Sequence, residues 1–485
     1  MKKEKIKTRI APSPTGNLHI GTARTALFNY LFAKKNNGKF LLRLEDTDNK
    51  RSTLKHEKNI IQNLEWLGLH WDEKPIRQME RLDIYKKYAQ ELLHKKQAYY
   101  CFCTTDELEK ERKRQIAKKI PPRYSGKCLG LKENEIKERI KKGEKPTLRL
   151  KIPESRGKIQ FTDLIRGKIQ DYAPNIGDFI IVKSDGVPIF YFAGVIDDYK
   201  QEIGHVIRGE DHISNTFNQI LIYEALGLKD KIPQYAHLPL ILNKDRSKMS
   251  KRKGNIVTIS DFRKKGYLKE ALINFMALLG WHPKNANDKD KEILTQDQLI
   301  EPFKLKDIGK SASIFDLEKL DYINGYYLRN MDDEEILKLL IPDYIESDWE
   351  KNEKLLIRAV SLVKDRMKKL SDFKELANYF FKTPILNKNL LIFKKSDINS
   401  TQKGLEISTR VLENLPEKEW QDQDKIQKIL EKTVLEQKLT NGDVFWPVRA
   451  ALSGREASPS PSEILWALGK EEALKRLTAA LGELK

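Results

Sequence analysis

The chain has 485 residues, several times the roughly 100–200 of one domain, which excludes a single small module. Hydrophobic residues make up 39% and charged residues 33%, a globular balance, and no uncharged apolar run reaches the ~18 residues of a membrane span. Three cysteines are too few for a disulfide framework, and no apolar signal segment follows the first residues. We therefore expect a cytoplasmic protein with no membrane partner.

The net charge of +20 is distributed unevenly along the chain. Residues 326–485 hold 27 basic and 27 acidic side chains, so the whole excess lies in residues 1–325. Residues 101–170 alone carry 20 Lys and Arg against 10 Asp and Glu. Such an excess indicates a polyanionic partner such as nucleic acid, although a charge run taken alone is more often a set of solvated helix faces.

The first predicted elements alternate between strand and helix. Residues 6–11 alternate in polarity like a strand, residues 12–16 interrupt the pattern with proline and glycine, and apolar positions then recur at helical spacing over 23–31. A second strand is predicted at 40–44 and a helix around 60–67. This alternation is typical of a parallel nucleotide-binding sheet.

Strand-like sequence returns later in the chain. Apolar runs at 179–182, 189–193 and 205–207 predict strands, so we expect the sheet to be interrupted by an insertion over roughly 104–185. After residue 271 the pattern is mostly helical with short loops, and no internal repeat or Gly/Ser linker occurs.

The loop between the first strand and the first helix, residues 12–22, predicts a phosphate site. A helix N-terminus presents free backbone N–H groups and the positive end of the helix dipole. His19 would stand there and donate a hydrogen bond to a phosphoryl oxygen, while Gly21 leaves room for a flat base. Taken alone, a histidine beside a glycine is usually structural.

A second segment, residues 243–254, is rich in Lys, Arg and turn-forming residues. This composition suits a mobile loop that closes on a polyphosphate and neutralises a departing pyrophosphate. Taken alone, it would be an ordinary basic surface turn. No GxxxxGK[ST] motif occurs, so the P-loop mode of phosphate binding is absent.

Together these two segments resemble the paired signatures of class I aminoacyl-tRNA synthetases. The amino-acid sequence is similar to that of bacterial glutamyl-tRNA synthetases over essentially the whole chain. The matching stretches are RIAPSPTG from Arg9, HIGTAR from His19, LEDTD from Leu44, LEWLGL from Leu64, VIRGEDH from Val206, DRSKMSKRKG from Asp245 and FWPVRAALSG from Phe445.

The resemblance implies an α/β Rossmann-type catalytic domain with an α+β insertion, followed by an all-α C-terminal anticodon-binding part. The implied divisions are the first half of the catalytic domain (1–103), an acceptor-stem-binding insertion (104–185), the second half of the catalytic domain (186–240), a stem-contact region with the KMSKR loop (241–325) and the helical anticodon-binding part (326–485). The basic residues 101–170 fall mostly in the insertion, where phosphate contacts would supply salt-sensitive affinity. The family suggests a monomer.

The resemblance also implies the reaction. L-glutamate is activated by ATP, accompanied by Mg²⁺, and is transferred to the terminal adenosine of tRNA(Glu), with tRNA(Gln) left open as a second substrate. Neither step needs a protein nucleophile, so His19 and Lys251 are assigned to phosphate stabilisation, Lys248 to the closing loop and Gly21 to adenine packing. The ATP-binding candidates are Pro12, Ser13, Pro14, Thr15, Gly16, Asn17, Leu18, His19, Ile20, Gly21, Thr22, Lys248, Met249, Ser250, Lys251 and Arg252.

A glutamate substrate needs a cation for its γ-carboxylate, and arginine suits this role because its planar fork pairs with two oxygens. Arg9 and Arg208 are the candidates. The motif places Glu45 to receive the α-ammonium group, with Ala11 and Ser13 lining the same loop.

The sequence departs from the family pattern in one stretch. The family commonly reads Pro-Thr-Tyr-His-Phe-Ala-Asn before Val-Val-Asp-Asp, whereas Phe190 and Gly194 here replace the tyrosine and the asparagine. Tyr191 is adjacent, but on a strand its side chain would face the opposite way from that of Phe190. Tyr191 therefore supplies the hydroxyl of the family's tyrosine only after a register shift. The roles of these three residues in glutamate binding stay open.

Cys101, Cys103 and Cys128 resemble the zinc-binding portion of some family members. Zinc prefers four ligands, and Gly130 stands where relatives carry a fourth His or Cys. Tyr124 is the fourth candidate, as in a shorter relative. Two alternatives remain open. Either these four side chains bind Zn²⁺, or the three cysteines are ordinary buried thiols.

Other functions fit less well. A truncated relative that attaches glutamate to a modified anticodon nucleoside lacks a part such as 326–485. Glutaminyl-tRNA synthetases usually read His-Ile-Gly-His, where Thr22 follows here, and have a β-rich C-terminal part. The length and the basic insertion oppose a small-molecule nucleotidylyltransferase, and a non-catalytic RNA-binding paralogue would lack His19 or Lys251.

Overall fold

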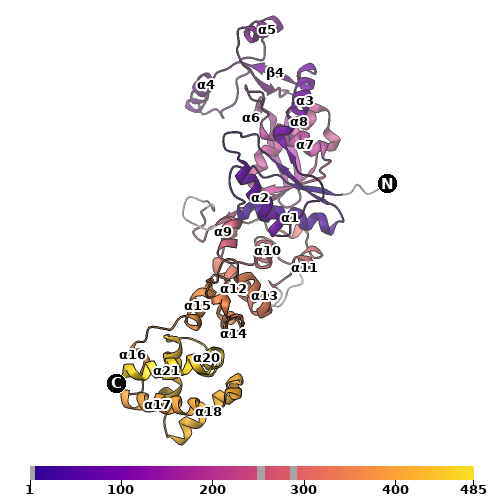
Figure 1. Ribbon diagram of the computed structural model, residues 1–485. Helices are drawn as coiled ribbons and strands as arrows, with labels where there is room; N and C mark the ends of the chain where they lie inside the picture. Colours follow the sequence, from indigo (N-terminus) through magenta and orange to yellow (C-terminus); the bar gives the residue numbers. More distant parts are fainter. Residues whose placement is uncertain (1–5, 154, 248, 250–256, 284–291, 485) are drawn as a thin grey trace. The chain divides into compact units, whose positions relative to one another are not determined.

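The computed structural model describes residues 6–153, 155–247, 249, 257–283 and 292–484 (Figure 1). The chain forms two compact units. The first unit comprises Met1–Lys264 with Lys269–Leu317, and the second comprises Lys265–Leu268 with Glu318–Lys485.

A mainly parallel sheet lies at the centre of the first unit. Its strands are β1 (Lys7–Ile10), β2 (Lys39–Leu44), β3 (Ile76–Arg77), β6 (Lys158–Asp163), β7 (Gly167–Tyr172), β9 (His205–Gly209) and β10 (Gln234–Leu238). β1 pairs with β2 and β2 with β3, while β10 pairs with both β9 and β6; all four pairings are parallel. β7 closes the edge as the antiparallel partner of β6.

The two halves of this sheet meet where β1 lies beside β9. The backbone N–H of Gly204 donates to the carbonyl oxygen of Lys7 at 3.1 Å, which gives the spatial order β3-β2-β1-β9-β10-β6-β7. The strand order therefore reverses direction between β1 and β9. In doubly wound sheets, ligands bind at the carboxyl ends of the strands at this switch point.

Helices cover both faces of the sheet. They are α1 (Ile20–Lys35), α2 (Leu54–Trp66), α3 (Leu82–His94), α7 (Phe190–Lys200) and α8 (Ile213–Leu226). α1 is buried around most of its circumference because it contacts β1, β2 and β9 on one side and α10 (Lys269–Leu278) on another. α8 ends at Gly227, whose φ of 78° is the left-handed conformation that glycine adopts without strain.

The strand predicted at 189–193 is wrong, because these residues begin helix α7. The run is apolar on all sides since α7 is buried in the core formed with α3 and α8, where Phe192, Ala193, Val195 and Ile196 are each fully buried. A short, wholly apolar run does not distinguish a buried strand from a buried helix.

The insertion has its own antiparallel sheet, in which β5 (Thr147–Leu150) pairs with β4 (Ala98–Cys101) and β8 (Ile180–Val182). Its helices are α4 (Thr105–Ala117), α5 (Glu133–Lys141) and α6 (Ala173–Ile176). Thr104 and Glu107 form a capping box that fixes the start of α4. β6 and β7 lie within residues 104–185 but belong to the main sheet, and β4 precedes residue 104.

The first unit contains a few further short elements. They are the parallel pair β11 (Ile241–Leu242) and β12 (Ser313–Ile314), with α9 (Ile259–Lys264), α10 and α11 (Gln296–Ile300).

The second unit is helical throughout its described residues, which confirms the predicted all-α C-terminal part. Most of α12 (Leu317–Arg329) lies in it, followed by α13 (Asp333–Leu340), α14 (Glu353–Val363), α15 (Asp372–Phe381), α16 (Lys388–Leu391), α17 (Ile398–Glu413), α18 (Gln423–Glu436), α19 (Asn441–Ser453), α20 (Pro461–Leu468) and α21 (Lys470–Leu484). α17 and α19 approach closely at Gly404, where a Cβ would lie 2.0 Å from the carbonyl oxygen of Asp443. Across the described part of the chain, no helix combines the length and the apolar character that a bilayer crossing needs.

Candidate active site

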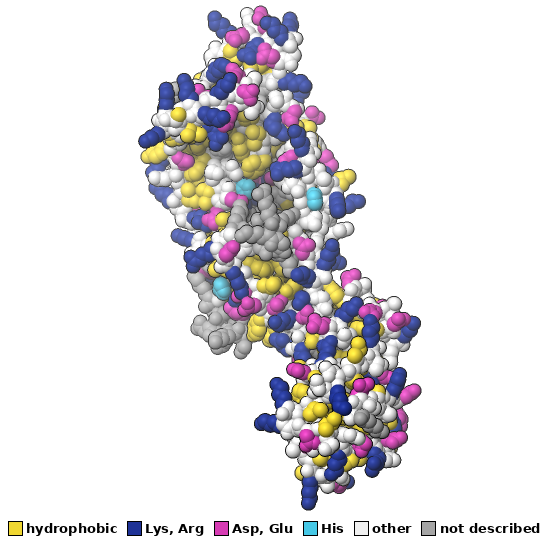
Figure 2. All heavy atoms as spheres, turned by 90° about the vertical axis from the view of Figure 1, so that its left-hand side faces the viewer, with side chains coloured by type: hydrophobic (Ala, Val, Ile, Leu, Met, Phe, Trp, Pro, Cys, Tyr) yellow, Lys and Arg dark blue, Asp and Glu magenta, His cyan; other side chains and the backbone are white. Residues whose placement is uncertain are grey.

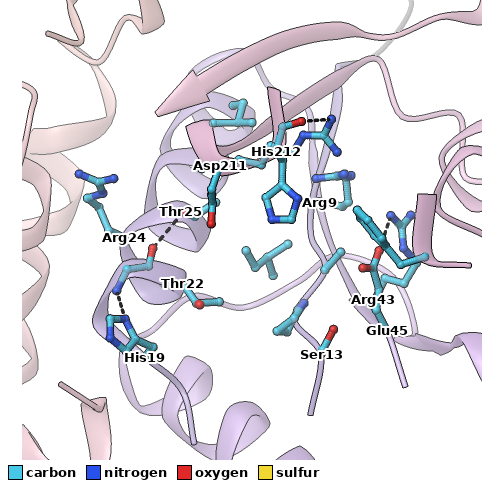
Figure 3. Close-up of a pocket in the computed structure, with 18 of the residues that line it drawn as sticks. Arg9, Ser13, His19, Thr22, Arg24, Thr25, Arg43, Glu45, Asp211 and His212 are labelled. Atoms are coloured by element: carbon cyan, nitrogen blue, oxygen red, sulfur yellow. Dashed lines mark hydrogen bonds and ion pairs between the residues drawn. The ribbon is translucent and has the colours of Figure 1, made fainter. Parts of the chain in front are cut away.

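A cavity of about 620 Å³ lies at the carboxyl ends of β1 and β9, where the sheet reverses direction. Figure 3 shows His19 and Arg24 on one side of it and Arg9, Arg43 and Glu45 on the opposite side. The residues that line the cavity are Arg9, Ile10, Ala11, Pro12, Ser13, His19, Gly21, Thr22, Arg24, Thr25, Arg43, Glu45, Thr47, Asp48, Arg51, Phe190, Ile207, Arg208, Gly209, Asp211, His212, Gln219, Pro239, Leu240, Ile241 and Met249.

His19 is the N-cap of α1. Its Nδ1 accepts a hydrogen bond from the backbone N–H of Gly21 at 3.0 Å, so in the neutral ring the proton lies on Nε2. A Cβ at position 21 would lie 3.3 Å from Nδ1, so a larger residue would crowd the ring. The cavity thus has at one end a helix N-terminus and an imidazole N–H, both suited to an anion.

The structure brings the two signature segments together. Val257 and Thr258, which follow the basic segment, pair with the residues around His19: Ile20 N–H donates to Val257 at 2.9 Å, and His19 forms an antiparallel bridge with Thr258. Met249, which lies within the segment, lines the cavity. The residues that follow the segment therefore pair with the start of α1, whereas the predicted ATP-binding residues Lys248, Ser250, Lys251 and Arg252 lie outside the described residues.

A buried ion network forms the opposite wall. Arg43 Nη1 and Arg9 Nε donate to the same oxygen of Asp198, at 2.7 and 3.0 Å, and Arg43 Nη2 donates to Glu45 at 3.2 Å. Burial opposes the charge on Arg43, but Asp198, Glu45 and Asp197 outweigh it and raise its pKa. Burial likewise opposes ionisation of Asp198, yet Arg43 and Arg9 lower its pKa, while burial raises the pKa of Glu45.

Arg208, on β9, is held differently. Nη2 donates to Thr216 Oγ1 at 2.7 Å and to Gln219 Oε1 at 2.8 Å, and Nε donates to His237 Nε2 at 3.3 Å. Among the described residues, no carboxylate lies within ion-pair distance of this guanidinium. Burial lowers its pKa to about 10, so Arg208 remains a cation at neutral pH.

The structure brings most predicted site residues to the cavity: Arg9, Ala11, Pro12, Ser13, His19, Gly21, Thr22, Glu45, Phe190, Arg208 and Met249 line it. A neighbouring cavity of about 240 Å³ is lined by Thr15, Gly16, Asn17 and Leu18 together with Pro12, Ser13, His19, Thr22 and Ile60. Pro14 and Ile20 line neither of these cavities; the carbonyl of Pro14 accepts from Thr53, and the Ile20 side chain is fully buried.

Tyr191 and Gly194 do not line the cavity. Tyr191 donates its hydroxyl hydrogen to the carbonyl of Ile180 at 3.1 Å, and Gly194 is buried inside α7. We expected Phe190 and Tyr191 to face opposite ways because residues 189–193 were predicted to form a strand. These residues are helical instead, and on the helix Phe190 reaches the cavity while Tyr191 points toward the insertion sheet.

Sequence reasoning missed several residues that line or support the cavity. Arg43 and Asp198 are buried charges, and the signal for Asp198 is a pair of acids at the end of an otherwise apolar run. His212 lines the cavity, and burial together with Arg208 lowers its pKa to about 4, so its ring is neutral at pH 7. Gln219 has no sequence signal, because only the fold places it beside Arg208.

The three cysteines gather with Tyr124 in the insertion. Their sulfur atoms all lie within 4.8 Å of one another, with Cys103 and Cys128 3.6 Å apart. The Tyr124 hydroxyl lies 3.4 Å from both Cys101 Sγ and Cys103 Sγ. Sulfurs bound at about 2.3 Å to one tetrahedral zinc would lie about 3.8 Å apart, so this cluster has the dimensions of a zinc site.

The insertion also has a basic surface. Figure 2 shows many Lys and Arg side chains in the upper part of the view, where α4 and α5 lie. On α4, Arg112 and Arg114 pair with glutamates one turn away, whereas Lys113 is exposed and has no ion pair with a described residue.

Two family models match the chain: "tRNA synthetases class I (E and Q), catalytic domain" over residues 5–322 and "Anticodon binding domain" over residues 334–481. A curated protein from Carboxydothermus hydrogenoformans, named Glutamate--tRNA ligase, is 45% identical over 97% of this chain and 99% of its own length. One named Glutamate--tRNA ligase 1, from Caldicellulosiruptor saccharolyticus, is 44% identical over 97% and 98%. The chain belongs to the class I glutamyl-tRNA synthetases.

A solved structure supports this membership. The crystal structure of a glutamate tRNA ligase from Elizabethkingia meningosepticum in complex with its amino acid has a TM-score of 0.85 and 32% identity, covering 99% of this chain and 100% of that one. The predicted fold class is thus confirmed, and the protein is an aminoacyl-tRNA ligase. The match to an anticodon-binding domain excludes the truncated relatives that lack one.

Proposed function

We propose that the protein is a glutamate–tRNA ligase. It activates L-glutamate with ATP to glutamyl-adenylate and transfers the glutamyl group to the 3′-terminal adenosine of tRNA(Glu), releasing AMP and pyrophosphate. The observation that carries this proposal is one cavity with a helix N-terminus and His19 at one end and, at the other, the buried Arg208, which has only neutral hydrogen-bond partners among the described residues.

The amino acid is assigned to the end of the cavity that contains Arg208, Arg9 and Glu45. Arg208 pairs with the γ-carboxylate because no acidic side chain among the described residues forms an ion pair with it, whereas Asp198 balances much of the charge of Arg9. Glu45 receives the α-ammonium group, which would favour the ionised carboxylate despite its burial. Ala11 and Ser13, which line the same cavity, are also assigned to glutamate binding.

ATP, accompanied by Mg²⁺, is assigned to the His19 end. The α-carboxylate of glutamate attacks the α-phosphorus in line, a P–O bond forms, and the bond to pyrophosphate breaks. His19 donates its Nε2–H to a phosphoryl oxygen as negative charge builds up, and Lys251 offsets the charge of the leaving pyrophosphate. Lys248 belongs to the closing loop, and Gly21 packs against the adenine.

In the second step the 2′-hydroxyl of the terminal adenosine attacks the acyl carbon, and AMP leaves. The basic insertion suits the phosphates of the acceptor stem, and the helical unit suits unpaired anticodon bases. tRNA(Gln) is a second candidate acceptor, and the protein is proposed to act as a cytoplasmic monomer.

Zn²⁺ is proposed to bind Cys101, Cys103, Tyr124 and Cys128, where it would hold the sheet and loops of the insertion together. Metal analysis of the purified protein is expected to give one zinc per chain, and Cys103→Ser is expected to lose it. A zinc content near zero in the wild type would leave three ordinary thiols.

Glutamate-dependent ATP–pyrophosphate exchange, measured with and without tRNA, tests the proposed function. The family typically needs tRNA for activation, so exchange is expected only when tRNA is added. Charging assays with tRNA(Glu) and tRNA(Gln) then define the acceptor. Exchange with no dependence on glutamate, or charging of neither tRNA, would overturn the proposal.

A further inference from the structure

Gln219, on α8, is a buried amide that lines the cavity. Its Oε1 accepts the hydrogen bond from Arg208 Nη2, and this contact fixes the orientation of the amide because a guanidinium only donates. Nε2 has no hydrogen-bond partner among the described residues. A Cβ added at Gly194 would lie 3.5 Å from Nε2, so the amide lies beside Gly194 of α7, which has no side chain.

The other hydrogen-bond acceptors of Arg208 are also neutral. They are the Thr216 hydroxyl, the His212 carbonyl and the His237 ring. Asp163 accepts from His237 Nδ1 at 2.7 Å, so His237 Nε2 carries the lone pair that accepts from Arg208. Arg208 is therefore oriented by four acceptors, none of which cancels its charge.

This arrangement differs from that of Arg9. The Asp198 carboxylate contacts Arg9 directly at 3.0 Å and is shared with Arg43. In a buried site a carboxylate acceptor at Arg208 would compete with any carboxylate of the ligand, whereas a neutral acceptor does not. Arg208 Nη1 also has no hydrogen-bond partner among the described residues.

We propose that Gln219 is a specificity-determining residue for the amino-acid substrate, an inference that rests on the proposed function. Its Oε1 orients Arg208, and its Nε2–H donates to an oxygen of the γ-carboxylate. The γ-group then meets only donors, from Arg208 and from Gln219. A carboxylate satisfies these donors with its lone pairs, whereas the amide NH₂ of glutamine would place a donor against them.

The test is Gln219→Glu, which has nearly the same shape but places a carboxylate on Arg208. The KM for glutamate in tRNA-dependent exchange is expected to rise on the order of 100-fold, with the KM for ATP unchanged. Gln219→Met, which removes both hydrogen bonds without adding charge, is expected to raise the glutamate KM about tenfold. Selectivity for glutamate over glutamine is expected to fall in both variants.

Gln298→Glu is the matched control. Gln298 is exposed in the capping box of α11, where glutamate serves equally well, so its kinetics are expected to equal those of the wild type. Direct binding of glutamate, measured by calorimetry, separates the two proposals. A wild type that neither binds glutamate nor supports exchange would overturn the proposed function. A wild type that does both, together with a folded Gln219→Glu variant of unchanged glutamate KM and selectivity, would overturn the role of Gln219 alone.

Discussion

Replacing Arg208 by alanine tests the assignment of the amino-acid end of the cavity. The variant removes a buried cation that has no acidic partner among the described residues, so a bound γ-carboxylate would lose its main counter-charge. Truncating one member of a buried, hydrogen-bonded charge pair costs about 2–5 kcal/mol. A middle value of about 4 kcal/mol corresponds to a roughly thousand-fold rise in the KM for glutamate.

Phe190→Ala provides the comparison, because Phe190 lines the same cavity without a polar side-chain atom. It packs against the rings of Tyr191 and His212, at centroid distances of 5.4 and 5.7 Å. Losing these contacts is expected to raise the glutamate KM less than about tenfold. Arg208→Lys is expected to fall between the two, since it keeps the charge but loses the planar fork.

The assay is tRNA-dependent ATP–pyrophosphate exchange over a range of glutamate concentrations, with the KM for ATP measured in parallel. Thermal melting of each variant shows whether the buried acceptors left by Arg208→Ala unfold the protein. Glutamate KM values that rise equally in folded Arg208→Ala and Phe190→Ala would refute the assignment of Arg208 to the γ-carboxylate.

Three further predictions concern His19, the buried ion network and the basic surface of the insertion. His19→Asn is expected to lower kcat about 100-fold with little change in melting temperature, because asparagine also caps helices; an unchanged kcat would remove His19 from the chemistry. Arg43 and Arg9 lower the pKa of Asp198, so its carboxylate stabilises the fold above its unfolded pKa of about 3.9 and less as pH falls through the folded pKa. The unfolding free energy lost in Asp198→Asn, measured in urea, should therefore be largest near pH 7 and shrink below pH ~4; a constant loss would contradict this. Lys113→Ala is expected to weaken tRNA binding and reduce the salt slope by about one unit without changing glutamate binding; an unchanged slope would place the tRNA elsewhere.

Local patterns predicted the elements that carry the site. The strand, the proline- and glycine-containing loop and the helix around His19 have clear sequence signals, and the structure has β1, the loop and α1 in that order. Arg9, Glu45 and Arg208 belong to motif stretches, and all three line one cavity. These residues lie next to the ends of parallel strands, where sequence order and fold topology together determine position.

The contacts between distant elements could not be predicted in this way. Asp198 lies 155 residues from Arg43, and their 2.7 Å contact depends on how α7 packs against β2. Gln219 lies on a helix whose sequence pattern is that of a buried core helix. The strand expected at 189–193 was wrong for a related reason, because burial on all sides removes the periodicity that distinguishes strand from helix.

A crystal structure of the protein with a non-hydrolysable ATP analogue and glutamate tests the central claim most directly. The account predicts the triphosphate between His19 and the segment that contains Lys251, with the γ-carboxylate of glutamate on Arg208. A nucleotide bound away from the N-terminus of α1, or glutamate bound without contact to Arg208, would contradict it.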